Sequence, residues 1–194
     1  MGSIMAKKSS KPKQIYQLEI WLAEIDPRIW RKFEVPSDIR LAKLHGVIQA
    51  VMGWTDSHLH SFSAGEDEYG MPDLDEDMYD SGMMDETRAN LTDLVTRPKD
   101  RFVYTYDYGD NWEHIIELVE IKEPQSGIKY PVCLAGERAC PPEDCGGPWN
   151  YPDFVKTMQG KNTKQRREFI EWLGYEFDPE EFDIEEVNKV LRGI

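Results

Sequence analysis

Tyr104-Thr105-Tyr106-Asp107-Tyr108-Gly109-Asp110-Asn111-Trp112-Glu113-His114 is the stretch of this chain that decides its fold. Apolar and aromatic side chains alternate on both sides of its polar centre, which predicts two strands joined by a tight turn. Gly109 is expected to supply a positive φ, and Asp110 and Asn111 tolerate the left-handed region. A simple turn does not require the aromatic rings, carboxylates and histidine that crowd this one.

Two earlier segments also show the period of two that is typical of strands. Residues 15–35 alternate apolar and polar side chains around the turn signal Asp26-Pro27, which predicts an antiparallel hairpin. Residues 58–64 are expected to form a third strand that begins at His58.

A helix is expected between these two segments. Apolar residues recur there at helical spacing, namely Leu41, Leu44, Ile48 and Val51. Ser37 or Asp38 could cap the helix at its start, and Gly53 is expected to end it.

The character of the chain changes after residue 121. Residues 122–149 are rich in proline, glycine and cysteine and predict a long structured loop, and helical spacing then predicts helices at 151–158, 164–173 and 184–191. Because no strand–helix–strand repeat appears, the expected fold class is α+β. We expect a mainly antiparallel sheet in a roll-like arrangement, with one helix after the first hairpin and helices at the C-terminal end.

The length of 194 residues fits one domain, and we expect a single α+β domain over residues 14–194. Residues 1–13 are rich in lysine and are expected to form a disordered basic tail. Residues 66–86 carry many carboxylates without periodicity and predict an acidic loop insertion, and residues 150–194 form the helical C-terminal part.

Charge and cysteine content narrow the class of protein. The formal net charge of −14 disfavours a nucleic-acid partner, since a polyanionic surface repels phosphate. No apolar run is long enough for a membrane span, and the start lacks the apolar core of a secretion signal. Three cysteines, an odd number, in a chain of this size favour a reducing compartment, so we expect a cytoplasmic protein.

The histidines suggest a metal site. His58 and His60 flank Leu59 on an expected strand and would therefore share a face, where two imidazoles can ligate zinc or another divalent metal. His114, with Asp107 or Asp110 near its turn, could complete the set. The alternative is structural, in which these histidines bond to carboxylates or backbone carbonyls.

The cysteines offer a second, weaker metal pattern. Cys140 and Cys145 could join two histidines around zinc, although their spacing is not that of a CxxC pair. Buried thiols that pack as small apolar groups are the alternative.

Fixed carboxylates beside aromatic rings also suit a recognition surface for a small cationic molecule or a basic protein. The residues that we expect to form this surface come from the turn and from the later Pro-Pro-Glu-Asp-Cys loop: Tyr106, Asp107, Tyr108, Asp110, Trp112, Glu143 and Asp144.

Several short motifs together resemble the plasmid pRiA4b open-reading-frame-three family over residues 15–175. They are Ile29-Trp30-Arg31, Gly53-Trp54 with His58-Leu59-His60, the Tyr106–Trp112 turn with His114, and Pro141–Gly147. The resemblance implies an α+β roll-like domain of plasmids and mobile elements, and it implies no known activity.

Three hypotheses follow. The leading one is a binding module without catalysis, whose contact surface combines the turn, the His-Leu-His segment and the Pro-Pro-Glu-Asp-Cys loop. The second is a metal-dependent, hydrolase-like enzyme that uses the His/Asp cluster. The third is an accessory factor of a mobile element that contacts a basic protein through its acidic face.

Overall fold

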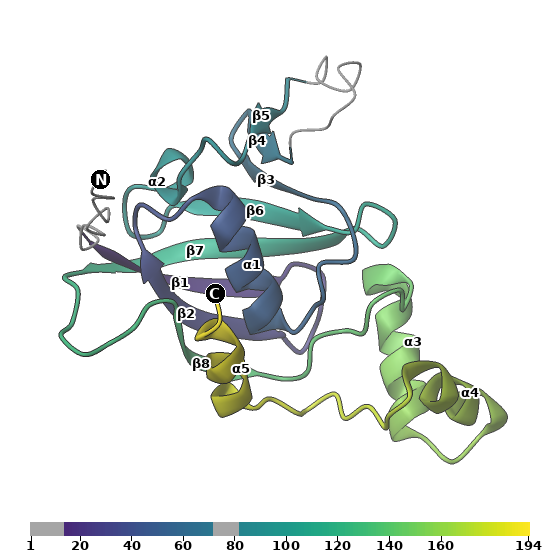
Figure 1. The fold of residues 1–194 in the computed structure, drawn as a ribbon. Coiled ribbons are helices and arrows are strands. Elements are labelled where there is room, and N and C mark those ends of the chain that lie inside the picture. The colour runs from purple at the N-terminus through teal and green to yellow at the C-terminus, as the bar shows by residue number, and fades with distance from the viewer. Residues whose placement is uncertain (1–13, 72–81) are drawn as a thin grey trace, which may run out of the picture.

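The computed structural model of the chain describes residues 14–71 and 82–194 (Figure 1). The expected basic tail and residues 72–81 of the expected acidic loop lie outside this range. The strands are β1 Ile15–Leu22, β2 Trp30–Pro36, β3 His60–Ala64, β4 Asp67–Gly70, β5 Met84–Asp85, β6 Arg101–Tyr106, β7 Trp112–Lys122 and β8 Val132–Glu137. The helices are α1 Leu41–Met52, α2 Leu91–Leu94, α3 Gly147–Gln159, α4 Lys164–Leu173 and α5 Ile184–Leu191.

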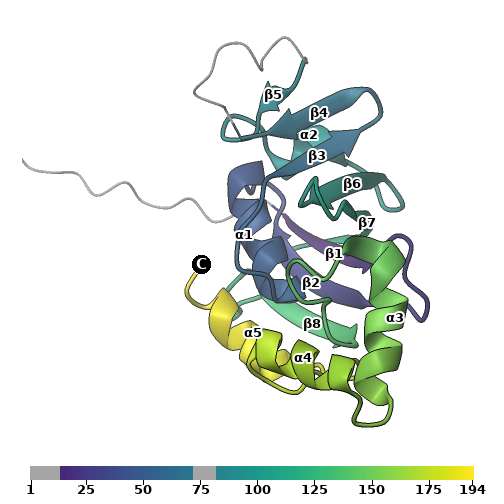
Figure 2. The ribbon, with the colours of Figure 1, turned by 90° about the vertical axis from the view of Figure 1, so that its right-hand side faces the viewer.

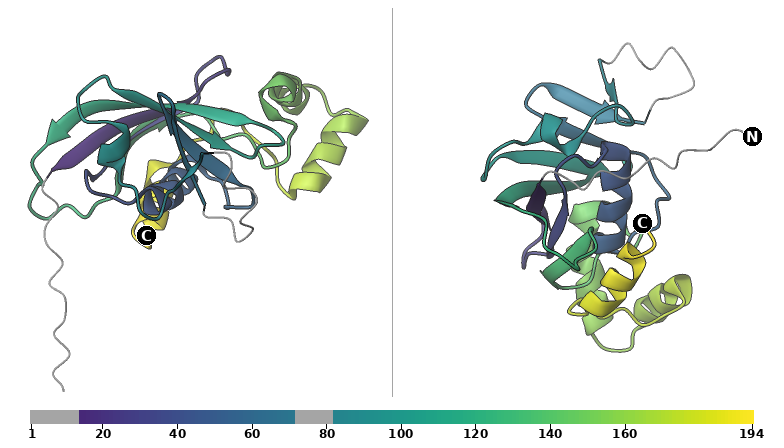
Figure 3. Two further views of the ribbon diagram at one scale, coloured as in Figure 1. Left: turned by 90° about the horizontal axis from the view of Figure 1, so that it is seen from above. Right: turned by 60° about the vertical axis from the view of Figure 1, so that its left-hand side comes forward.

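The strands form one open sheet in the order β5-β4-β3-β6-β7-β1-β2-β8. Every neighbouring pair is antiparallel except β4 and β5. Helix α1 lies on one face of the sheet with α5 beside it, and α3 and α4 lie beyond one end of the central strands (Figures 1 and 3). This arrangement confirms the predicted α+β fold with a mainly antiparallel sheet.

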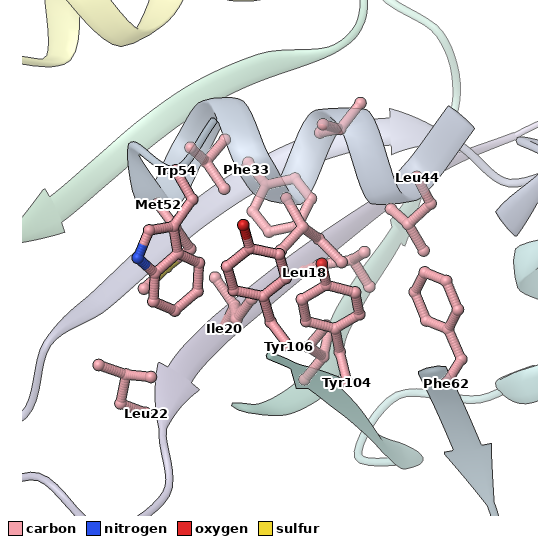
Figure 4. Packing of buried hydrophobic residues seen from close by; sticks show 14 of the residues in the cluster. Leu18, Ile20, Leu22, Phe33, Leu44, Met52, Trp54, Phe62, Tyr104 and Tyr106 are labelled. Atoms are coloured by element: carbon pink, nitrogen blue, oxygen red, sulfur yellow. The ribbon is translucent and has the colours of Figure 1, made fainter. Parts of the chain in front are cut away.

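The core lies between the sheet and α1. Side chains of β1, β2, β3 and β6 point from the sheet towards Leu44 and Met52 of the helix and towards Trp54 just after it (Figure 4). Leu18, Phe33 and Tyr104 are among the fully buried members. Burying a large apolar side chain contributes roughly 1.5–3 kcal/mol, so this interface holds the helix on the sheet.

Three strands fall where the sequence predicted loops. β4 and β5 lie inside the expected acidic loop 66–86, and in β4 Tyr69 and Gly70 are buried while Asp67 and Glu68 are exposed. β8 lies inside the expected loop 122–149 and pairs with β2 at the edge of the sheet. The side chain of Asn188 in α5 hydrogen-bonds to both the backbone nitrogen and the carbonyl oxygen of Cys133. It therefore satisfies the backbone groups of this one residue on the edge strand β8.

Some element boundaries also differ from the prediction. α1 begins after Arg40 and not at a Ser37 or Asp38 cap, because the backbone around Arg40 bridges to Asn90. β3 begins at His60, which leaves His58 in the irregular segment before the strand. α3 begins at Gly147, four residues earlier than predicted, with a proline in its first turn.

Among the described residues, no helix combines the length and the apolar character that a membrane crossing requires.

Candidate functional site

Three segments that are distant in sequence meet at one end of β6. The backbone nitrogen of Asp107, in the turn between β6 and β7, donates to the carbonyl of Leu59 at 2.9 Å. The backbone nitrogen of Thr55 donates to Glu143 at 2.9 Å, and that of Gly146 donates to Asp110 at 3.0 Å. The turn, the segment before β3 and the Pro-Pro-Glu-Asp-Cys loop therefore share one surface, as the sequence predicted.

Glycine allows the loop to approach the turn this closely. A Cβ atom on Gly147 would lie 2.4 Å from the carbonyl oxygen of Asp110, and Gly147 has a φ of +73°. A larger residue would push the loop away from the turn.

The turn itself does not use Gly109 as predicted. Asp107 and Asn111 have the positive φ values, 57° and 56°, and Gly109 does not. The backbone nitrogen of Gly109 instead donates to Oδ1 of Asp107 at 2.9 Å. Asp107 tolerates this conformation because its short polar side chain bonds locally.

His58 points into a ring of carboxylates. Its Nε2 atom lies 3.3 Å from Oδ1 of Asp144, 3.7 Å from Oδ2 of Asp107 and 3.7 Å from Oε2 of Glu143. This nitrogen is closed off from solvent, and none of the described residues makes a hydrogen bond with it. The centroid of the His58 imidazole ring is 5.8 Å from that of the Tyr106 ring, and the two planes are nearly perpendicular.

The two less exposed carboxylates are held so that one oxygen faces His58. Asp107 uses Oδ1 for the bond to Gly109, which leaves Oδ2 towards the imidazole. Glu143 accepts through Oε1 from the backbone and hydroxyl of Thr55, and its Oε2 faces His58. These hydrogen bonds therefore fix the positions of both oxygens.

Tyr106 supports this arrangement. Its hydroxyl donates to the Glu143 carboxylate, at 3.1 Å from Oε1 and 3.2 Å from Oε2, and accepts from the backbone nitrogen of Ser57 at 3.0 Å. Burial raises the pKa of Tyr106 well above its usual value, and the nearby Glu143 carboxylate adds to this effect. The hydroxyl thus keeps its proton and remains a donor to Glu143.

In the described part of the chain, one group of three side chains could hold a metal ion: His58, Asp107 and Asp144. Their ligand atoms all lie within 4.8 Å of one another. In a tetrahedral site with bonds of about 2.1 Å, ligand atoms are about 3.4 Å apart, close to the distances from His58 Nε2. One imidazole with two or three carboxylates suits Zn²⁺ better than Ca²⁺ or Mg²⁺, which take oxygen ligands.

The structure does not bring His60 and His114 into this group. His60 is buried, and its Nε2 lies 2.8 Å from Oε2 of Glu86. His114 is fully buried between Trp54 and Tyr104, and its Nδ1 lies 3.1 Å from the carbonyl oxygen of Tyr104. Of the three predicted histidine ligands, only His58 faces the carboxylates of Asp107, Glu143 and Asp144.

The cysteines likewise stand outside the metal group. Cys140 packs near Gly53 at the end of α1, and burial raises the pKa of the Cys140 thiol far above its usual value. Burial raises the pKa of Cys145 to about 12. Both thiols pack against the hydrophobic core, as the packing alternative expects.

The predicted recognition surface is partly buried. Tyr106 and Trp112 are at most 1% exposed and belong to the core, where Trp112 packs against Trp54 and Tyr151. They face inward because β6 and β7 present alternate residues to the helical side. Tyr108, by contrast, is 48% exposed beside the carboxylates.

The residues that support the site were not evident from the sequence pattern. Gln49 of α1 bonds through its side-chain oxygen to the backbone of Asp56 and through its side-chain nitrogen to the hydroxyl of Tyr104. Together with Thr55 it fixes the segment that carries His58. A buried glutamine on the apolar stripe of a helix was the available signal.

The chain belongs to the family described as plasmid pRiA4b ORF-3-like protein, whose model matches residues 14–186. It is 36% identical over 183 residues to the uncharacterized protein y4hQ of Sinorhizobium fredii, a match that covers 93% of this chain and 92% of that protein. A crystal structure of MM3350, a protein of unknown function from Methanosarcina mazei Go1, has the same fold, with a TM-score of 0.81 and 34% identity. That match covers 91% of this chain and 98% of the other.

Proposed function

We propose that this protein is a binding module for a divalent metal ion held by His58, Asp107 and Asp144, with Glu143 as a further ligand. The observation that carries the proposal is the environment of His58 Nε2. This atom is enclosed and has no hydrogen-bond partner among the described residues, yet it faces three carboxylate oxygens at 3.3–3.7 Å.

A cation explains two costs of this arrangement together. A buried nitrogen without a partner costs about 1–3 kcal/mol, and carboxylates that crowd one point repel each other. An ion between them would bond to the nitrogen and neutralise the carboxylates. The ion would also link the β6–β7 turn, the segment before β3 and the 141–146 loop.

The test is a titration of chelator-treated protein with Zn²⁺, followed by elemental analysis and by NMR of the four histidine rings. We expect one equivalent of zinc and a large shift of the His58 ring alone. Binding that shifts His60 or His114 instead, or no binding, would contradict the proposal.

A pair of variants separates ligation from general charge. Asp107→Asn keeps the shape of the side chain and should weaken zinc binding at least about tenfold, because an amide is a poor substitute for a carboxylate ligand. Asp153→Asn removes a carboxylate on the exposed side of α3 and should leave binding unchanged.

A metal-dependent hydrolase is the second candidate function. The side chain of Asp144 is 69% exposed, which supports a site with an open position where an ion could activate water. Hydrolysis of nitrophenyl esters or phosphate esters by the zinc-loaded protein, lost in Asp107→Asn, would favour this candidate. Zinc binding without hydrolysis would favour the binding module over the hydrolase.

A further inference from the structure

The three segments that build the candidate site carry a high density of negative charge. Residues 53–60, 106–114 and 139–150 contain six carboxylates and neither lysine nor arginine. These carboxylates belong to Asp56, Asp107, Asp110, Glu113, Glu143 and Asp144. A divalent ion would offset only part of their charge, so the surface stays negative when the proposed metal site is filled.

The protein supplies no basic partners for these carboxylates. On the sheet, carboxylates pair with basic side chains, as Glu117 does with Arg101. Around the site, within the described residues, the ion-pair contacts of the six carboxylates are all to histidines, namely His45 and His58. Like charges that lack a counter-charge repel each other, and a positively charged partner is therefore attracted to this surface.

Each of the three segments also exposes one large apolar side chain. Leu59 is 56% exposed, Tyr108 is 48% exposed and Trp149 is 83% exposed. Trp149 has the highest exposure of the large apolar side chains in the part of the chain that the structure describes. Tryptophan and tyrosine are among the side chains that contribute most to binding energy at protein interfaces, so their exposure here indicates a contact surface.

Backbone contacts bring the segments that carry these side chains together. The β6–β7 turn donates through the backbone nitrogen of Asp107 to the carbonyl of Leu59. Gly147, two residues before Trp149, lies against the carbonyl of Asp110. Helix α3, which carries Trp149, therefore begins beside the end of the central strands where this turn lies (Figures 1 and 2).

The chemistry of this surface favours a partner that is both cationic and partly apolar. The faces of tryptophan and tyrosine rings attract arginine and lysine side chains, and nearby carboxylates add to the attraction. Because the three exposed side chains stand on three different segments, an extended ligand can contact all of them and a single small cation cannot. The carboxylates disfavour a partner rich in phosphate.

We propose that a docking surface formed by Leu59, Tyr108, Glu113 and Trp149 binds a basic peptide segment of a partner protein, in which arginine or lysine alternates with apolar residues. Glu113 belongs to this surface because it lines the same small cavity as Pro148, the neighbour of Trp149. The docking surface borders the proposed metal site, but none of its four residues is a proposed metal ligand. Docking therefore does not depend on a bound ion.

The test is a titration of the full chain with a short blocked peptide that repeats arginine, leucine and glycine, followed by NMR of the indole and backbone amide groups. We expect saturable shifts of the Trp149 indole and of amides in residues 55–60, 107–113 and 143–150, with a dissociation constant of about 100 µM. The same peptide with glutamate in place of arginine should not bind. Binding should persist in chelator-treated protein, so a failure of zinc to bind would leave this result intact. Equal binding of the two peptides, shifts that do not saturate, or loss of binding after chelation would overturn the proposal.

Variants locate the contact. Trp149→Ala should weaken peptide binding about tenfold, the usual effect of removing an aromatic side chain that dominates an interface. Trp172→Ala, at a position 49% exposed on α4, is the matched control and should bind the peptide as the unaltered protein does. Glu113→Gln should weaken binding about threefold, whereas Glu171→Gln, at an exposed position of α4, should not. Because both tryptophans are exposed, neither alanine variant should melt earlier. A Trp149→Ala variant that binds as tightly as Trp172→Ala would refute the assignment.

Discussion

The Nε2 atom of His60 lies 2.8 Å from Oε2 of Glu86, and both side chains are almost completely buried. The pair joins β3 to the segment just after β5, across the edge of the sheet. The His60 ring also stacks on His45 of α1, with ring centroids 3.5 Å apart and planes 5° from parallel. This contact ties the outer strands to the helix that covers the sheet.

Removal of Glu86 should therefore destabilise the fold. Glu86→Ala leaves His60 without a polar partner in the core and should lower the free energy of unfolding by about 3 kcal/mol. Glu86→Gln keeps one hydrogen bond and should cost less. Glu68→Ala, at an exposed position of β4, is the control, and urea denaturation measures all three. An alanine variant as stable as the control would show that the pair contributes little.

Acid should destabilise the protein through His114. Burial lowers the pKa of His114 from 6.5 to about 4, so the folded state favours the neutral ring. The stability that depends on the neutral ring is fully present above pH 6.5. It is lost as the pH falls towards 4, and the free energy of unfolding then drops by about 3 kcal/mol, at about 1.4 kcal/mol per pKa unit. Burial lowers the pKa of His45 as well, with the same sign.

The variant His114→Phe tests this origin. It should be less stable at pH 7, because it loses the bond to Tyr104, but its stability should fall less steeply between pH 6.5 and 4 than that of the unaltered chain. Equal slopes in denaturant melts across this range would contradict the assignment.

Replacement of Arg31 by lysine should destabilise the folded protein. Its buried guanidinium donates to four backbone carbonyl oxygens, those of Val51, Trp30, Glu137 and Arg138, at 2.7–2.9 Å. An ammonium cannot reach these divergent acceptors, so Arg31→Lys should cost about 3 kcal/mol or more. Arg28→Lys, at an exposed position, serves as the matched control, and thermal unfolding compares the two.

Tyr106 should act as a positioning residue for the proposed metal. Tyr106→Phe removes the hydroxyl that orients Glu143 and the backbone of Ser57, so zinc affinity should fall about tenfold while the stoichiometry stays at one. The loss should appear in calorimetric titration at constant pH. Tyr108→Phe, in the same turn but exposed, should bind zinc as the unaltered protein does.

The sequence predicted the elements that bury a regular apolar pattern. The 15–35 hairpin, the α1 stripe and the strands around Tyr104 and Ile116 each place apolar residues at the period of their element, so the pattern alone was sufficient. β8 was missed because it buries little beyond Cys133 and is held by backbone pairing with β2 and by Asn188 of α5. Such edge strands are set by tertiary contacts.

In the candidate site, too, the sequence pattern predicted some features, and tertiary contacts determine the others. The spacing of His58 and His60 predicted a shared face, and both do lie against the tyrosines of β6. Their roles differ because Glu86 comes within reach of His60, whereas loop 141–146 comes within reach of His58. Neither neighbour is determined by the local sequence, so the spacing alone could not show that His58 faces Asp144 while His60 faces Glu86.

The most direct test of the metal proposal is anomalous diffraction from crystals of this protein grown with Zn²⁺. We expect one strong peak about 2.0–2.2 Å from His58 Nε2 and from the facing oxygens of Asp107 and Asp144. A zinc peak at His60, at His114 or at the cysteines, or no peak at His58 in crystals saturated with zinc, would contradict it.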